Sequence, residues 1–141
     1  MSAPAAYLME TGHQDSSAPD SSRRARCFEV WAALRSLGRQ GLEELVDRCC
    51  RHAAHFAREL RVAGVEIPHD VVLNQVLARF GDDARTDRVI EAVQREGTMW
   101  AGRTVWQGKV FMRISVSNWS TTSEDVERSV AAILRAYGDC R

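Results

Sequence analysis

The chain has 141 residues, of which 45% are hydrophobic and 27% charged, a composition typical of one globular domain or of part of a longer protein. Nineteen acidic residues balance nineteen basic ones, so the charge favours neither nucleic acid nor an anionic membrane as a partner. No apolar run approaches the ~20 residues of a membrane span. The four cysteines form no disulfide framework, so we expect a reducing, cytoplasmic location.

The first part of the chain predicts two helices behind a flexible segment. Residues 1–22 are rich in Ala, Ser, Pro and Asp without a hydrophobic period, and we expect them to be flexible. Residues 24–37 are apolar around most of a helix circumference, which is typical of a helix buried on several sides. Gly38 and Gly41 predict a turn, and residues 42–63 a long amphipathic helix. The first helix needs more neighbours than this chain supplies.

The remainder of the chain predicts the order β-α-β-β-α. The expected elements are a strand at 71–80, a helix ending at 96, a hairpin of strands at 99–106 and 110–117, and a helix at 122–137. Asp83 or Thr86 is expected to cap the first of these helices, and Thr121 with Glu124 to form a capping box for the second. The fold class is therefore a small α/β (α+β) domain, an antiparallel three- or four-stranded sheet with helices on one face.

One arginine of the second hairpin strand is the first candidate for function. Within KVFMRISV, aliphatic side chains alternate with other residues, the period of a strand with one buried face. Arg113 falls on the opposite face. An arginine in the middle of a strand, turned away from the aliphatic core, needs an anionic partner or solvent. We therefore expect Arg113 to mark a binding site.

A group of cysteine and histidine residues on the long helix offers a second candidate. Cys49, Cys50, His52 and His55 crowd about two turns, and one-turn spacing can serve a metal ion. However, Cys49 belongs to the apolar stripe, and no second ligand pair with suitable spacing occurs elsewhere in the sequence. Cys-His nucleophilic catalysis would also need an orienting third group. The sequence therefore favours a buried cysteine beside a solvated helix face, and no metal.

The chain resembles group II pyridoxal-phosphate-dependent amino-acid decarboxylases, which include the aromatic amino-acid and glutamate decarboxylases. The resemblance begins at residue 22, runs to the C-terminus, and follows the region after the cofactor lysine in that family. It rests on an ordered series of segments: SRRAR at 22–26, FxxW with LxxxG at 28–38, GLEEL at 41–45, the strand at 71–80, FMRIxVSN at 111–118 and TTSED at 121–125.

This resemblance implies the C-terminal part of the aspartate-aminotransferase-like fold (fold type I), pyridoxal phosphate as cofactor, an amino-acid substrate and a homodimer. It implies a helix at residues 23–40 that leads from an absent large domain, followed by a small α/β domain at 41–141. By the same resemblance, Arg113 reaches the active site and can bind the substrate carboxylate. Arg23 matches a recurring arginine near the domain junction and is a second candidate for substrate binding.

The chain departs from this family in the groups that carry the cofactor. Pyridoxal-phosphate chemistry needs a lysine for the Schiff base and a carboxylate for the pyridinium nitrogen. The only lysine in the sequence is Lys109, at a predicted hairpin turn with no histidine before it. We therefore expect the chain to be inactive alone, a truncated product or fragment. A non-catalytic binding or dimerisation module, and a fragment of another fold type I enzyme such as an aminotransferase, remain the alternatives.

Overall fold

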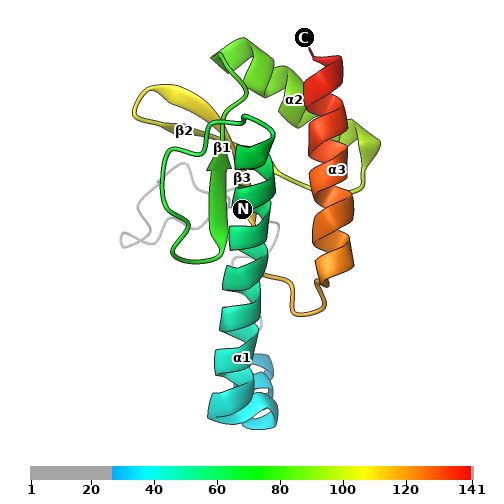
Figure 1. Ribbon diagram of the computed structural model, residues 1–141. Coiled ribbons are helices and arrows are strands. Elements are labelled where there is room, and N and C mark those ends of the chain that lie inside the picture. The colour runs from blue at the N-terminus through cyan, green and yellow to red at the C-terminus, as the bar shows by residue number, and fades with distance from the viewer. Residues whose placement is uncertain (1–26, 141) are drawn as a thin grey trace, which may run out of the picture. The chain divides into compact units, whose positions relative to one another are not determined.

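The computed structural model describes residues 27–140, and these form three helices and three strands in the order α1-β1-α2-β2-β3-α3 (Figure 1). The chain divides into two compact units, Met1–Leu37 and Gly38–Arg141. The segment 1–22 that we expected to be flexible, and the candidate Arg23, lie outside the described residues. None of the described helices combines the length and the apolar character that crossing a membrane requires.

Helix α1, Cys27–Val62, is interrupted at Gly38. The backbone there has φ 63° and ψ −172°, a left-handed conformation that glycine adopts without a steric penalty. The two helices expected on either side of residues 38–41 are therefore confirmed, although Gly41 lies inside the second helix. The turn of the chain falls on Gly38 alone.

The described part of the first unit is the helical stretch 27–37. Its large apolar side chains are exposed: Phe28, Val30, Trp31, Leu34 and Leu37. The Phe28 and Trp31 rings contact each other, with centroids 5.9 Å apart. A contiguous exposed apolar surface of this kind marks an interaction site more often than a solvated one. The expectation that this helix needs further neighbours agrees with its exposure.

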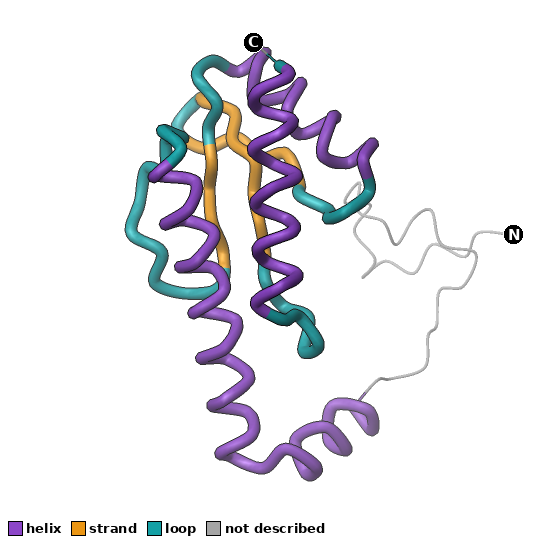
Figure 2. The backbone as a smooth tube through the Cα atoms, turned by 45° about the vertical axis from the view of Figure 1, so that its right-hand side comes forward, coloured by secondary structure: helices purple, strands orange, loops and turns teal. Residues whose placement is uncertain are grey.

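In the second unit, three antiparallel strands form one sheet in the order β1-β3-β2. The strands are β1, Gln75–Ala78, β2, Gly102–Trp106, and β3, Lys109–Ser115. Figure 2 shows them side by side with the helices packed across them. The two-residue turn between β2 and β3 has positive φ at Gln107 and Gly108, 48° and 74°, as in a type I′ turn. The expected hairpin is confirmed.

The first strand is shorter than the sequence predicted. Residues 71–74 precede β1, and Val72 in this stretch is 81% exposed. The central strand β3 ends at Ser115, so only Asn74 still finds a partner, through its backbone and side chain with Val116. The apolar run Val-Val-Leu therefore has no strand to pair with, and strand propensity alone does not order it.

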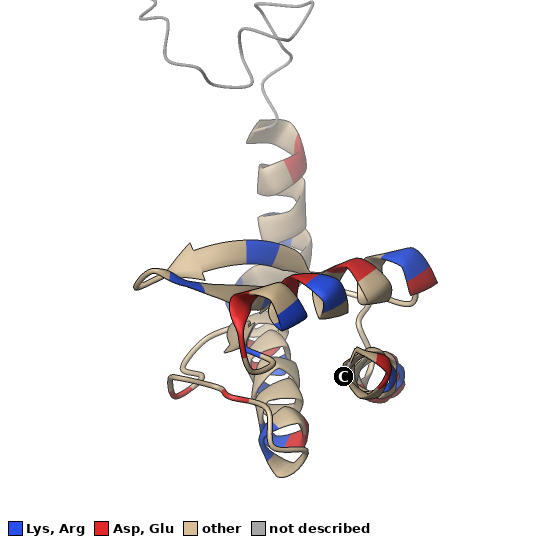
Figure 3. Ribbon diagram, turned by 90° about the horizontal axis from the view of Figure 1, so that it is seen from above, with Lys and Arg blue, Asp and Glu red and all other residues tan. Residues whose placement is uncertain are grey.

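Three helical segments of the second unit cover the same face of the sheet. Helices α2, Asp83–Glu96, and α3, Ser123–Asp139, contribute to one core with the second half of α1 and with β1 and β3. The sheet contributes every second residue of β1 and β3 to this core. Val76 of β1 pairs with Ile114 of β3, and Ala78 pairs with Met112. Positive and negative side chains alternate along the helices, in keeping with the zero net charge (Figure 3).

Both helix caps are displaced from the expected residues. Asp82 caps α2 and accepts the Arg85 N–H at 2.7 Å, whereas Asp83 and Thr86 were expected to do so. The Thr86 hydroxyl instead accepts the buried Phe80 N–H at 3.1 Å.

The capping box of α3 is one residue later than predicted, at Thr122 and Asp125. The sequence pattern favours Thr121, because Glu124 follows it at the third position, whereas Asp125 follows Thr122. The choice is made by the loop, since Thr121 is occupied with His52 through its carbonyl and with Asn118 through its N–H.

Candidate functional site

Arg113 lies at the middle of β3 on the face of the sheet that the helices leave open. The residues before and after it, Met112 and Ile114, are buried, while Arg113 itself is exposed. Across the strands it pairs with Leu77 of β1 and Gly102 of β2. Within residues 27–140, no hydrogen bond or ion pair engages its guanidinium. The direction predicted by the alternation is confirmed, and the group is available to an anion.

The guanidinium lies over strand β2. A Cβ built on Gly102 would sit 3.8 Å from Nη2 of Arg113, an ordinary van der Waals contact. The position that opposes Arg113 on β2 therefore carries no side chain of its own, and the guanidinium extends across it. Arginine recognises carboxylates through a planar fork that donates two parallel hydrogen bonds and stays charged at any physiological pH.

A cavity of about 500 Å³ opens at the end of β3. Its walls come from the C-terminal end of β3, the first turn of α3, Phe56 of α1 and the loop that contains Trp100. Hydroxyl and amide side chains supply much of its lining, among them Ser115, Ser117 and Asn118. Arg113 is not part of this lining, so the arginine and the cavity are separate features of the same strand.

The rim of this cavity is fixed to α1. Arg48 Nη2 donates to the carbonyl of Trp119 at 2.9 Å, and His52 Nε2 lies 3.2 Å from the carbonyl of Thr121. Within the loop, the Asn118 carboxamide oxygen accepts from both the N–H and the hydroxyl of Ser120. The Trp119 side chain is consequently presented on a hydrogen-bonded loop, and it is 75% exposed.

Asp125 is the one carboxylate in the cavity lining, and it is already engaged. It accepts hydrogen bonds from the backbone N–H and the hydroxyl of Thr122, at 2.9 Å and 2.8 Å. It also forms an ion pair with Arg128. The pKa of Asp125 is lowered to about 2, chiefly by the hydrogen bond from the Thr122 backbone and then by those from the Thr122 hydroxyl and Arg128. A carboxylate with this pKa is ionised at neutral pH and too weak a base for proton abstraction. Asp125 serves the helix cap.

The cysteine and histidine group of α1 does not gather into a metal site. Cys49 and His52 are buried, and the His52 ring contacts the Thr121 carbonyl. His55 lies 3.7 Å from the Glu59 carboxylate on the same helix. Among residues 27–140, no three His, Cys, Asp or Glu side chains are arranged to hold an ion. His52 instead has the structural task of holding the cavity rim.

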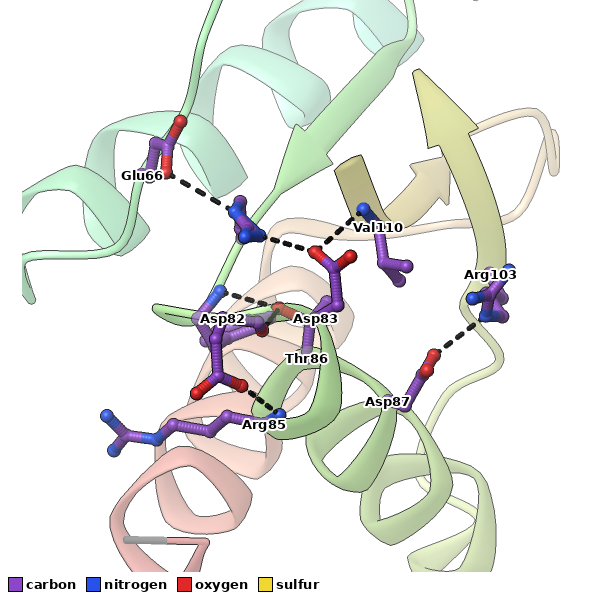
Figure 4. A network of polar contacts seen from close by, with 10 residues as sticks. Glu66, Asp82, Asp83, Arg85, Thr86, Asp87, Arg103 and Val110 are labelled. Atoms are coloured by element: carbon purple, nitrogen blue, oxygen red, sulfur yellow. Dashed lines mark hydrogen bonds and ion pairs between the residues drawn. The ribbon is translucent and has the colours of Figure 1, made fainter. Parts of the chain in front are cut away.

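A network of polar contacts ties the opposite end of the sheet together (Figure 4). Arg79 binds Asp83 at 2.9 Å and lies 3.8 Å from Glu66, while the same Asp83 oxygen accepts the Val110 N–H. Arg103 of β2 binds Asp87 of α2 at 2.8 Å.

Sequence reasoning missed this network, as it missed the contacts of Arg48 and His52. Apart from Arg79 with Asp83, which are four residues apart, these contacts join residues distant in the chain, and no local pattern predicts such contacts. The network keeps β1, α2 and β3 in place, and thereby the strand that carries Arg113.

No protein-family model matches the chain. It is 29% identical over 109 residues to histidine decarboxylase of Mus musculus, covering 76% of this chain and 16% of that protein. It is also 29% identical over 107 residues to histidine decarboxylase of Drosophila melanogaster, covering 74% of this chain and 13% of that protein. The chain therefore spans about a sixth of these relatives or less.

Solved structures agree. Tryptophan decarboxylase of Catharanthus roseus in complex with L-tryptophan superposes with a TM-score of 0.73 at 21% identity, over 83% of this chain and 27% of that one. Mouse CSAD in its apo form superposes with a TM-score of 0.71 at 16% identity, over 92% of this chain and 32% of that one. The resemblance to the C-terminal part of group II pyridoxal-phosphate-dependent decarboxylases is confirmed. So is the expected fold, the small α/β domain of fold type I.

Pyridoxal phosphate is the cofactor of this decarboxylase family. The described residues do not fit it by themselves. Lys109, the only lysine in the sequence, is exposed beside the hairpin turn and pairs with Trp106, whereas a Schiff-base lysine needs a desolvated pocket. The cavity at the end of β3 contains neither lysine nor histidine, and its carboxylate is held by Thr122 and Arg128. Groups able to bind the cofactor are not assembled in residues 27–140.

Proposed function

We propose that the chain is the C-terminal part of a pyridoxal-phosphate-dependent amino-acid decarboxylase, a carboxy-lyase, and that Arg113 binds a carboxylate of the amino-acid substrate. The complete enzyme would use the cofactor to stabilise the carbanion left when CO2 departs. The contribution of this chain is to hold and orient the substrate. Decarboxylase relatives support the family, and the free guanidinium of Arg113 supports the role.

The observation that carries this proposal is the placement of Arg113. It extends from the middle of a central strand that is hydrogen-bonded on both sides, so its backbone is fixed. Its side chain lies on the open face of the sheet without a partner among residues 27–140. The fixed backbone sets where the side chain starts, and the unpaired guanidinium remains free to bind a carboxylate through two parallel hydrogen bonds.

The chain alone is proposed to be inactive, since Lys109 is in the wrong element for a Schiff base. The remainder of the enzyme would cover the open face of the sheet and supply the cofactor site. The exposed apolar helix at 27–37 is a natural contact for that larger part or for a second subunit of a homodimer. In this arrangement, residues 23–40 lead from the large domain and residues 41–141 form the small one.

Arg23 would lie near the domain junction as a second contact for the substrate. We also propose that the chain is a truncated product or a fragment of the decarboxylase, and that the enzyme is located in the cytoplasm. The amino acid on which the enzyme acts is a matter for the part of the site outside this chain.

The second candidate function is a non-catalytic module that associates through its exposed apolar helix. The observation that favours it is the same surface at 27–37 together with the absence of a cofactor-binding constellation among the described residues. Size-exclusion chromatography of the purified chain separates the two. A stable monomer or symmetric dimer favours the module, and aggregation favours a piece of a larger enzyme.

The direct test is a chimera in which this chain replaces the matching segment of mouse histidine decarboxylase. We expect the chimera to bind pyridoxal phosphate and to release CO2 from L-histidine, the substrate named for that relative. Circular dichroism and cofactor absorbance verify that the chimera is folded and loaded. A folded, loaded chimera without decarboxylase activity would overturn the proposal.

A further inference from the structure

We propose that Gly102 is a positioning residue for Arg113: the missing side chain leaves the space into which the guanidinium extends, and so sets its direction. The inference rests on the proposed role of Arg113 as the carboxylate-binding group. It concerns a residue on a different strand, which no sequence motif marks.

The register of the sheet brings these two residues together. Gly102 opposes Arg113 in the β2–β3 pair, so both side-chain positions lie on the open face. On the other side of β3, Leu77 opposes Arg113 and carries a branched side chain. The arginine therefore has a leucine on one flank and a glycine on the other. Its Nη2 lies 3.8 Å from where a Cβ of residue 102 would be.

This distance predicts a size threshold at position 102. An alanine methyl would meet Nη2 at ordinary van der Waals separation and leave the guanidinium where it is. The additional methyl groups of valine extend beyond that contact, toward the space the guanidinium occupies. The guanidinium must then rotate away, because the strands fix both Cα atoms. We expect Gly102→Ala to be neutral for Arg113 and Gly102→Val to displace it.

Backbone conformation does not require glycine here. Positive φ is recorded for glycines elsewhere in residues 27–140, but not for Gly102. Valine has a higher strand propensity than glycine, so Gly102→Val is expected to keep or raise the melting temperature. A purely structural role for Gly102 predicts the opposite, a fall in melting temperature. The two effects of this substitution, on stability and on Arg113, therefore separate positioning from packing.

Nuclear magnetic resonance on the full 141-residue chain tests the geometry without any ligand. We expect a nuclear Overhauser effect between the Gly102 Hα and the Arg113 side chain in the unmodified protein. We also expect Gly102→Val to shift the Arg113 Nε–H resonance, with Gly102→Ala close to the original value. Thr104→Val is the matched control, on the same strand and face but opposite Phe111. Absence of the cross-strand effect in the unmodified protein overturns the inference, even if a variant fails to fold.

The chimera with mouse histidine decarboxylase supplies the functional arm. Gly102→Val is expected to raise KM in the same direction as Arg113→Ala with the cofactor spectrum unchanged, and Gly102→Ala to restore the original KM. An active chimera whose KM is insensitive to Gly102→Val overturns the inference and leaves the proposed function standing. An inactive but folded chimera overturns the proposed function, while the resonance measurement still decides the position of Arg113.

Discussion

The guanidinium of Arg79 donates to the carboxylate of Asp83 at 2.9 Å, and the same oxygen accepts the backbone N–H of Val110 at 3.1 Å. Through this pair, the residue after β1 is tied to the start of α2 and to the start of β3. The Arg79 side chain is only 12% exposed and also lies 3.8 Å from Glu66. The strand that presents Arg113 is therefore anchored at its beginning by a partly buried ionic contact, in which the Asp83 carboxylate is 48% exposed.

Arg79→Met should lower the free energy of unfolding by about 1–3 kcal/mol, the range for hydrogen bonds to charged groups. Methionine keeps the apolar part of the side chain, so the loss reports on the ionic contacts. Urea denaturation measures it. Arg58→Met is the control, because Arg58 is exposed and binds only its neighbour Glu59. Equal losses in the two variants would show that the Arg79 network contributes nothing beyond a surface pair.

The Asp125 cap should make stability depend on acid. The pKa of Asp125 is about 2 in the folded chain, below its value of about 3.9 in an unfolded one. Its contribution is therefore present above about pH 4 and is lost as the pH falls toward about 2. The melting-temperature difference between the unmodified chain and Asp125→Asn should shrink over that interval.

The pKa of Glu96 is also lowered, chiefly by the hydrogen bond from Arg135 and then by that from Thr98. It is present in both proteins, so its contribution cancels in the comparison. A difference that stays constant from pH 5 to pH 2 would contradict the assignment of the low pKa to the cap.

Zinc should leave the melting temperature of the purified chain unchanged. The ring of His52 is oriented by the Thr121 carbonyl, and Cys49 is buried in the core. His52→Leu should instead lower the free energy of unfolding by about 1 kcal/mol or more, since it frees a carbonyl on the cavity rim. Differential scanning calorimetry with and without zinc tests both statements. A clear rise with zinc, abolished in His52→Leu, would establish a metal site on α1.

Borohydride reduction of the chain with pyridoxal phosphate should fix no cofactor at a defined lysine. Lys109 is exposed at the hairpin and lies beside no histidine or carboxylate of the cavity. Absorbance before and after reduction, followed by peptide mapping, makes the measurement, and Lys109→Arg is the control. Stoichiometric labelling at Lys109 would mean that this residue forms a Schiff base, and that the chain is not inactive by itself.

The sequence predicted the direction of Arg113 because its neighbours Met112 and Ile114 face the core, although Phe111 on the other face of β3 is buried as well. Alternation along a strand assigns successive side chains to opposite faces of the sheet. The apolar run at 71–73 was wrongly predicted as part of β1. Its hydrophobicity is that of a strand, but β3 ends at Ser115 and leaves it no partner strand. The cap of α3 was misplaced because Thr121 with Glu124 fits the capping-box pattern, whereas the contacts of the Thr121 backbone with His52 and Asn118 leave the cap to Thr122.

Gly102 and Arg48 could not be predicted from the sequence. Their importance depends on strand register and on a helix lying beside a loop, which bring together residues distant in the chain. The sequence also could not decide whether Cys49 and His52 bind a metal ion. Helical spacing places them one turn apart whether or not an ion is bound, so the tertiary contacts were needed. Local pattern therefore predicted elements and faces, while the contacts between elements came only from the structure.

The kinetics of Arg113→Ala in the chimera with mouse histidine decarboxylase test the central claim most directly. We expect kcat/KM to fall about 10- to 100-fold, because a charge-assisted hydrogen bond to a carboxylate contributes about 1.5–3 kcal/mol. Arg113→Lys should recover part of the loss, since lysine keeps the charge without the fork. An Arg113→Ala chimera with unchanged kcat/KM would contradict the account and remove Arg113 from the substrate site.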